Sequence, residues 1–384
     1  MQKTILITGM SGIKIEACLK KFISNFKDFR TNHIDRKPCV IKFDSVFEDL
    51  YYKQNASASR SKQAWKNVIL KQSYPILQQL WSSTLKEICI MVSDIRKEDP
   101  DKVILINLHS CYYHNMTQEY LSFISIKELL NLNPSFIVTF IDDIYEIYHR
   151  LTLAGGIFHD ESNVTPTQMI LRLLRLLDWR AKETMLSRFI ANNLGITNYV
   201  FAVKHSFDTF SNLLFENCPK VYLSHPITEI RRLEANGNAK EATKVREEIA
   251  DISDRLSSNF TTFLPTTIDE FIIKEKPTMS GKTKIYYPAL EKRWNVDQYK
   301  TRNESLYTNS GFTYINKLWK ENASVKIDKK ISNLLEALSA SISDQVTIRD
   351  YTLVEQSDML VVYRPVFNGN ASGGVKQEFN YEVV

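Results

Sequence analysis

RDYTLVEQSDMLVVYRPVFNGNASGGVKQE, residues 349–378, decides the fold of the second half of this chain. Its middle, residues 359–363, is a short apolar run, which predicts a parallel-sheet strand covered on both faces. The glycine-rich turn at 368–374 can take positive φ, so a ligand can approach the backbone closely. A helix after this turn would present Glu378 at the carboxyl end of the strand, where open α/β sheets bind ligands.

A glutamate placed in this way, with a second acid upstream, is what a double displacement at a sugar carbon requires. The structural alternative is a solvated first-turn residue that the helix dipole favours. Glu382 lies one turn further along the same face, and we interpret it as a helix-face acid.

The spacings resemble those of the nucleoside 2-deoxyribosyltransferase superfamily, and most closely its 2′-deoxynucleoside 5′-phosphate N-hydrolase branch. In that family an aspartate is followed eight residues later by a second acid and then by S-x-G-x-x-x-E, whose glutamate is the nucleophile. Asp350, Asp358, Ser372, Gly374 and Glu378 hold these places here. Ser372, Gly374 and Asp358 are therefore candidate substrate-binding residues, although Asp358 also fits a strand-start role.

The family's catalytic tyrosine has a counterpart in residues 220–227, KVYLSHPI, where Tyr222 takes its place. The resemblance implies that Glu378 attacks the anomeric carbon, that Asp350 handles the proton of the departing base, and that Tyr222 orients Glu378. Ser372 would contact the sugar or a phosphate oxygen. His225 is a candidate substrate contact, with a loop role as the alternative. The family's glycine-rich phosphate loop is replaced by SHPITEIRR at 224–232, so a 5′-monophosphate substrate is not implied.

The amino-terminal half opens with TILITGMSGIKIEA, residues 4–17, which resembles the phosphate loop of P-loop nucleotide kinases and ATPases. In the pattern G-x-x-x-x-G-K-[S/T], counted from Gly9, the last three positions fall on Lys14, Ile15 and Glu16. An acid in place of the magnesium-binding hydroxyl repels phosphate, so we predict a degenerate loop. Asp142 and Asp143 fit either a magnesium-binding acid or a cap on the following helix.

Apolar strands at 40–43, 102–109, 136–141 and 199–203 alternate with helical patterns at 76–95 and 169–194, which predicts parallel strands with crossover helices. We therefore expect an α/β fold with two doubly wound parallel-sheet domains. The expected domains are 1–217, P-loop kinase-like, and 218–384, deoxyribosyltransferase-like with a basic insertion at about 274–311. Residues 229–258 predict a helical hairpin or a kinked helix around Gly237.

Bulk properties indicate a cytoplasmic enzyme. The chain has 384 residues and a hydrophobic content of 43%, enough for two cores. Its net charge of +5 indicates no general affinity for nucleic acid, and its five dispersed cysteines indicate no disulfide framework. No signal peptide or membrane span is evident. His109, Cys111 and His114 fit no zinc spacing, so we expect no metal and no cofactor.

The predicted function is cleavage of the base–sugar bond of a nucleoside, a nucleotide or NAD, as part of a regulated antiviral or toxin effector. By resemblance we expect a homo-oligomer. Because family members continue beyond the nucleophile, we also expect either that the end of the given chain is trimmed or that a partner completes the fold. The basic insertion could bind a regulatory protein or nucleic acid. The alternatives are a P-loop kinase or ATPase, and a non-catalytic nucleotide-binding scaffold.

Overall fold

The computed structural model describes residues 3–29, 37–55, 72–114, 117–154, 158, 164–215, 218–268, 270, 274–277, 283–286, 329–364, 366–367 and 369–382. The chain divides into two compact units. The first comprises Met1–Ile141, Arg150–Glu161 and Asp178–Val203, and the second comprises Asp142–His149, Ser162–Leu177 and Lys204–Val384. The boundary expected at 217/218 thus lies inside the second unit.

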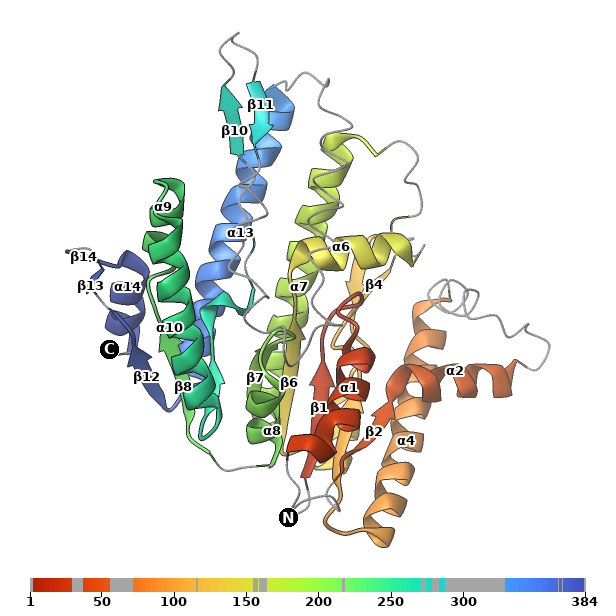
Figure 1. Cartoon of the computed structure of the whole chain (residues 1–384). Helices are drawn as coiled ribbons and strands as arrows, with labels where there is room; N and C mark the ends of the chain where they lie inside the picture. Colours follow the sequence, from red (N-terminus) through yellow and green to blue (C-terminus); the bar gives the residue numbers. More distant parts are fainter. Residues whose placement is uncertain are drawn as a thin grey trace. The chain divides into compact units, whose positions relative to one another are not determined.

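The first unit contains a five-stranded sheet in the order β2-β3-β1-β6-β7 (Figure 1). All four neighbouring pairs are parallel. The strands are β1 (Lys3–Thr8), β2 (Cys39–Lys42), β3 (Val103–Asn107), β6 (Phe136–Ile141) and β7 (Thr197–Ala202), and a separate hairpin pairs β4 (Tyr112–His114) with β5 (Glu119–Leu121). Continuous apolar runs form these strands because a parallel sheet is covered on both faces.

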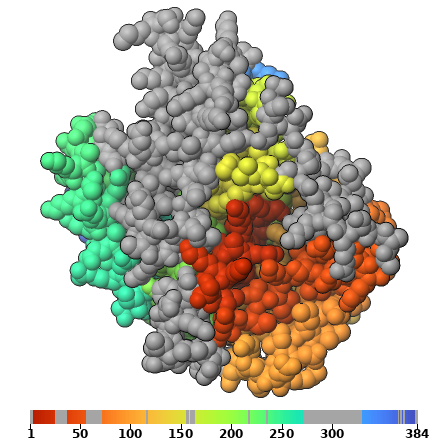
Figure 2. Space-filling model, turned by 45° about the vertical axis from the view of Figure 1, so that its right-hand side comes forward, coloured from red at the N-terminus to blue at the C-terminus, as the bar shows by residue number. Residues whose placement is uncertain are grey.

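The helices of the first unit are α1 (Ile15–Phe29), α2 (Phe43–Gln54), α4 (Tyr74–Glu98) and α5 (Ile126–Leu132), while α6 (Ile144–Leu153) and α7 (Pro166–Leu194) are divided between the units. The helix patterns expected at 76–95 and 169–194 are therefore confirmed. One core cluster joins Phe43 and Trp81, whose ring centroids are 4.1 Å apart, to Leu6 and Ile106 of the sheet. In Figure 2, α1 and α2, coloured red to orange-red, lie beside α4 in orange.

The second unit contains a three-stranded parallel sheet in the order β12-β8-β9. Its strands are β8 (Lys220–Ser224), β9 (Thr261–Phe263) and β12 (Met359–Val362), and its helices are α8 (Phe207–Phe215), α9 (Ile227–Ala235), α10 (Ala239–Ser257), the 3₁₀ helix η2 (Pro265–Thr267), α13 (Lys329–Glu355) and α14 (Gly373–Glu382). The first strand in sequence, β8, lies between the later two, as in a doubly wound sheet. The predicted α/β class with parallel sheets is confirmed in both units.

One expectation about this sheet was wrong. Strand β12 is not covered on both faces, since Met359 is 39% exposed and the other three residues are half-buried. In the described part of the sheet it is also an edge strand, and an apolar run alone does not show a strand's position, because that depends on which other segments pair with it.

The predicted helical hairpin is formed by α9 and α10, which pack against each other on either side of Gly237. Gly237 has φ +87°, a left-handed conformation that ends the first helix. The basic insertion contributes an antiparallel hairpin, β10 (Lys274–Pro277) with β11 (Thr283–Tyr286), and its remainder at 287–311 lies outside the described residues. Two further strands, β13 (Val366–Phe367) and β14 (Asn370–Ala371), precede α14. In the described parts of the chain, no helix combines the length and hydrophobicity of a membrane span.

Candidate active site

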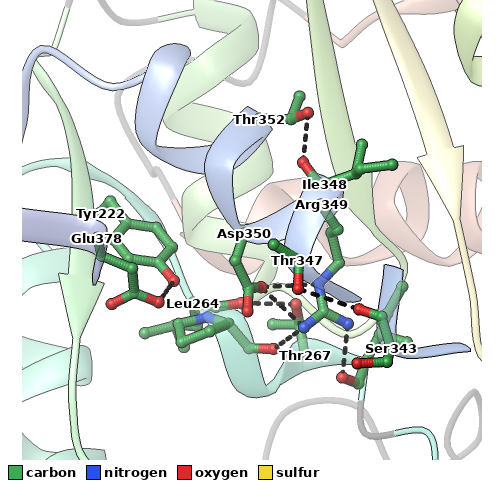
Figure 3. Close-up of polar contacts among 12 residues, drawn as sticks. Tyr222, Leu264, Thr267, Ser343, Thr347, Ile348, Arg349, Asp350, Thr352 and Glu378 are labelled. Atoms are coloured by element: carbon green, nitrogen blue, oxygen red, sulfur yellow. Dashed lines mark hydrogen bonds and ion pairs between the residues drawn. The ribbon is translucent and has the colours of Figure 1, made fainter. Parts of the chain in front are cut away.

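The candidate site is centred on Glu378, whose carboxylate is held by two hydroxyl groups of β8. Tyr222 Oη donates a hydrogen bond to Glu378 Oε1 at 2.7 Å, and Ser224 Oγ donates one to Oε2. Tyr222 and Ser224 are two residues apart on one strand, so their side chains lie on the same face of the sheet. All three side chains are buried, and Glu378 is only 8% exposed. The contact between Tyr222 and Glu378 is visible in Figure 3.

The turn before α14 places Glu378 on the inner face of that helix. Gly369, with φ +76°, lies in the β13–β14 turn, and Ser372 is buried while its carbonyl accepts the first helical bond, from Lys376 N at 3.0 Å. Val375, three residues before Glu378, is buried on the same face. A Cβ atom added at Gly374 would meet nothing within 4 Å, so this position borders open space. Ser372 and Gly374 therefore lie in the turn that presents Glu378.

The second acid, Asp350, belongs to α13 and is paired with its neighbour Arg349. The Arg349 guanidinium donates to Asp350 Oδ1 from Nε at 3.0 Å and from Nη2 at 2.8 Å. Figure 3 shows Asp350 between this guanidinium and the Tyr222–Glu378 pair. The structure thus brings Asp350, Tyr222 and Glu378, three residues predicted from the sequence, into one cluster, in which Tyr222 and Glu378 are buried and Asp350 is half-buried.

Burial, hydrogen bonds and neighbouring charges shift the pKa values of the cluster in opposite directions. Burial raises the pKa of Glu378, whereas hydrogen bonds from Ser224 and Tyr222 lower it, and the charge of Asp350 raises it again, with a net upward shift. Burial also raises the pKa of Asp350, and the positive charge of Arg349 only partly offsets that effect. The pKa of Tyr222 lies well above its ordinary value because of burial and the two neighbouring carboxylates, so Tyr222 remains a donor.

The two other candidate substrate contacts are His225 and Asp358. His225 follows β8 and is buried, with Nδ1 3.1 Å from Leu223 O, and burial lowers its pKa to about 4. A neutral imidazole at neutral pH follows from this shift. Asp358 lies before β12 and accepts hydrogen bonds from Lys220 N at 2.8 Å and Lys220 Nζ at 3.3 Å. It occupies the amino edge of the sheet and is not part of the cluster around Glu378.

Two residues of the cluster were not found from the sequence. Ser224 has a weak signal, because it lies two residues after the predicted Tyr222 and must share its face if the segment is a strand. The sequence gives no signal for Arg349 other than its position directly before Asp350. Its remaining bonds, from Nη1 to Ile268 O at 2.8 Å and from Nη2 to Pro265 O at 2.9 Å, reach residues 81 and 84 positions away.

In the first unit, the glycine loop after β1 is occupied by the protein's own side chains. Met10, Ile13 and Ile15 are buried, and a Cβ atom on Gly9 would lie 2.8 Å from Ile15 Cδ1. Lys14 is exposed with φ +57°. The residues around Gly9 are therefore packed against the protein's own apolar side chains.

A buried carboxylate accepts the amide groups at this edge of the sheet. Glu183 of α7, which is 1% exposed, accepts hydrogen bonds from Gly9 N at 3.1 Å, Ser110 N at 2.7 Å and Cys111 N at 2.9 Å. The Cys111 thiol also donates to Glu183 at 3.2 Å. An anion therefore sits at the carboxyl ends of β1 and β3, and the chain itself supplies it.

The remaining predicted polar groups make local contacts. Asp143 accepts the Tyr145 N–H at 2.8 Å, which caps α6, and Asp142 accepts the Asp143 N–H at 2.8 Å. His109 Nδ1 lies 2.6 Å from Gly9 O. Over the described residues, no group of three or more His, Cys, Asp or Glu side chains is arranged to hold a metal ion.

Comparison with known protein families found no family model that matches the chain, and comparison with curated proteins found no match.

Proposed function

We propose that the second unit is an N-glycosidase that cleaves the base–sugar bond of a nucleoside, a nucleotide or NAD, with Glu378 as the nucleophile. The observation that carries this proposal is the buried Glu378 carboxylate held by the Tyr222 and Ser224 hydroxyls, next to a second acid, the half-buried Asp350. Two hydroxyl donors stabilise the ionised form that a nucleophile needs. The chain's resemblance to the nucleoside 2-deoxyribosyltransferase superfamily supports the same assignment.

In the first step, a Glu378 oxygen attacks the anomeric carbon through an oxocarbenium-like transition state, and the bond from that carbon to the base nitrogen breaks. The bonding electrons leave with the base, which takes a proton from Asp350. Burial raises the pKa of Asp350, which is the direction of shift that a general acid needs.

In the second step, water or an acceptor base opens the glycosyl ester, and the ionised Asp350 takes the proton of the incoming group. Both carboxyl groups then return to their starting states. Ser372 and Gly374, in the turn before α14, contact the sugar or a phosphate oxygen, and His225 contacts the substrate as a neutral group. The reaction requires no metal and no cofactor.

The kinase or ATPase alternative has less support. It would place catalysis in residues 9–16 and at Asp142 and Asp143, yet Asp143 caps a helix, and Glu183 accepts the Gly9 N–H. A second carboxylate near a phosphate would repel it. The first unit fits a scaffold or docking module, and the protein fits a cytoplasmic homo-oligomeric effector whose basic insertion, at about 274–311, binds a regulatory protein or nucleic acid.

The experiment incubates the protein with NAD, deoxynucleosides, and nucleoside mono- and triphosphates, and measures free base by chromatography. Glu378→Gln and Asp350→Asn should abolish base release. Asp358→Asn is the matched control, because it makes the same change in an exposed carboxyl group that pairs with Lys220. A silent wild-type protein is assayed again with cell extract and nucleic acid as activators. Base release that survives Glu378→Gln would refute the proposal, as would magnesium-dependent ATP turnover with no base release.

A further inference from the structure

Among the described residues, Arg349 makes four hydrogen bonds in the second unit, and they converge on Asp350 and one short segment. Two reach Asp350 Oδ1, from Nε at 3.0 Å and from Nη2 at 2.8 Å. The other two reach the carbonyl oxygens of Ile268, at 2.8 Å from Nη1, and Pro265, at 2.9 Å from Nη2. The Arg349 side chain is only 9% exposed, so water does not compete for these donors.

The segment that holds Arg349 is itself fixed. Thr267 Oγ1 donates to Leu264 O at 2.8 Å, and Leu264 N donates to His205 Nε2 at 3.1 Å. The guanidinium is planar and rigid, so two carbonyl contacts on one side determine where its remaining N–H groups point. The Nε N–H and the second Nη2 N–H both point to one oxygen of Asp350.

Both Arg349 bonds to Asp350 end on Oδ1, so the two oxygens of this carboxyl group differ in their environment. An oxygen that accepts two N–H groups from a cation is the wrong place for a proton, because a hydroxyl oxygen is the weaker acceptor. Protonation of Asp350 therefore falls on Oδ2. We propose that Arg349 is a positioning residue that confines the transferable proton of Asp350 to Oδ2 and aims that oxygen at the departing base. The kinetic part of this inference rests on the proposed function.

The charged and titratable groups around Asp350 come from three elements. Arg349 lies on the same helix, Tyr222 comes from β8 and Glu378 from α14, while Glu270 lies beyond Arg349 and accepts the Ile144 N–H at 2.8 Å. Burial would lower the pKa of Arg349, but the charges of Asp350 and Glu270 more than offset this and raise it. Arg349 thus remains a cation, and it is the group that opposes the effect of burial on Asp350.

The direct test titrates Asp350 by NMR in protein labelled with ¹³C at the aspartate carboxyl carbons, with the signal assigned by its loss in Asp350→Asn. Arg349→Gln should raise the pKa of Asp350 by about 1–3 units, the range by which an adjacent cation lowers a carboxyl pKa. Arg349→Lys, which keeps the charge but not the fork, should raise it by less. Arg232→Gln is the matched control, because Arg232 is an exposed arginine paired with Glu229.

The kinetic arm uses whichever compound of the substrate panel releases base. Arg349→Lys should lower kcat by about 100-fold, the loss that a misplacement of about 1 Å produces, with KM nearly unchanged. Arg349→Gln should also move the basic limb of the kcat/KM profile to higher pH. A merely structural arginine would change stability without moving that limb.

An unchanged Asp350 titration in a folded Arg349→Gln or Arg349→Lys protein would overturn the inference. If Arg349→Gln does not fold, the Arg349→Lys titration decides. If the wild-type protein releases no base, the glycosidase proposal fails while the titration still tests the role of Arg349. If base is released but Asp350 titrates identically in wild type and variant, only this inference fails.

Discussion

Tyr222→Phe is the sharpest test of how the fold holds Glu378. The change deletes one hydroxyl and keeps the ring, so the buried carboxylate retains only Ser224 as a donor. A hydrogen bond to a neutral group contributes about 0.5–1.5 kcal/mol and one to a charged group about 1.5–3 kcal/mol. The variant should therefore be less stable at every pH, with a further deficit of about 1–1.5 kcal/mol, or about one pKa unit, wherever Glu378 is ionised.

The sign of the pH dependence follows from the direction of the shift. Burial raises the folded-state pKa of Glu378 above its unfolded value. Stability from this group is therefore fully present below the unfolded pKa and declines as pH rises towards the folded pKa. Tyr222→Phe raises the folded pKa further, so the difference between variant and wild type should grow from acidic to neutral pH.

The assay is hydrogen–deuterium exchange in a urea series at several pH values, read by mass spectrometry on peptides from β8 and α14. Local reporters are needed because the five tryptophans are spread along the chain, so their fluorescence does not separate the two units, and a two-unit chain need not unfold in one step. In a Glu378→Gln background the same tyrosine change should have no pH dependence. A deficit in Tyr222→Phe that is equal at acidic and neutral pH would refute the assignment of the hydroxyl to an ionised Glu378.

Three further outcomes are expected. Ser224→Ala should raise the pKa of Glu378 and lower base release at neutral pH by about 10-fold, the effect of losing about 1.4 kcal/mol, with recovery at higher pH; a pH–rate profile with an unmoved acidic limb would contradict this. Glu183→Gln should destabilise the first unit by about 1–3 kcal/mol, because its NH₂ group would face a buried N–H, and hydrogen–deuterium exchange in a urea series, read on peptides from β1 and β3, measures the loss. Asp358→Asn should leave base release within about twofold, as for other surface changes; chromatography of the released base checks this, and a larger loss would return Asp358 to the site.

The sequence predicted those parts of the fold whose information is local. The apolar run at 359–362 forms a strand because four consecutive apolar residues favour a segment packed against the core. The glycine turn after it precedes a helix, as expected. The strand's position at a sheet edge was not predicted, since it depends on which other segments pair with it. The spacing from Asp350 to Glu378 was informative because a helix, a strand and a turn of fixed lengths connect the two acids.

The contacts that hold the acids could not be predicted in the same way. Glu378 is 154 residues from Ser224 and 156 from Tyr222 in sequence, so the match of two hydroxyls to its two oxygens exists only once α14 packs on β8. Arg349 depends on the carbonyl group of Pro265 in the 3₁₀ helix η2 and on that of Ile268 directly after it, and backbone carbonyls carry no sequence signal. Side chains that bond to other side chains of a motif are accessible to pattern analysis, whereas those that bond to a distant backbone are not.

Glu183 makes a contact that the loop sequence at 9–16 does not indicate. From that sequence we predict a degenerate phosphate loop, because the lysine and hydroxyl positions of the P-loop pattern fall on Ile15 and Glu16, and the sequence leaves open whether a nucleotide binds in another register. A carboxylate 174 residues away from Gly9 accepts its amide, and it also accepts two amides after β3. Those N–H groups would otherwise be buried donors without a partner, at a cost of about 1–3 kcal/mol each. The carboxylate therefore stabilises the first unit without any ligand, and a nucleotide phosphate at this edge would have to displace a buried anion that already satisfies the same donors.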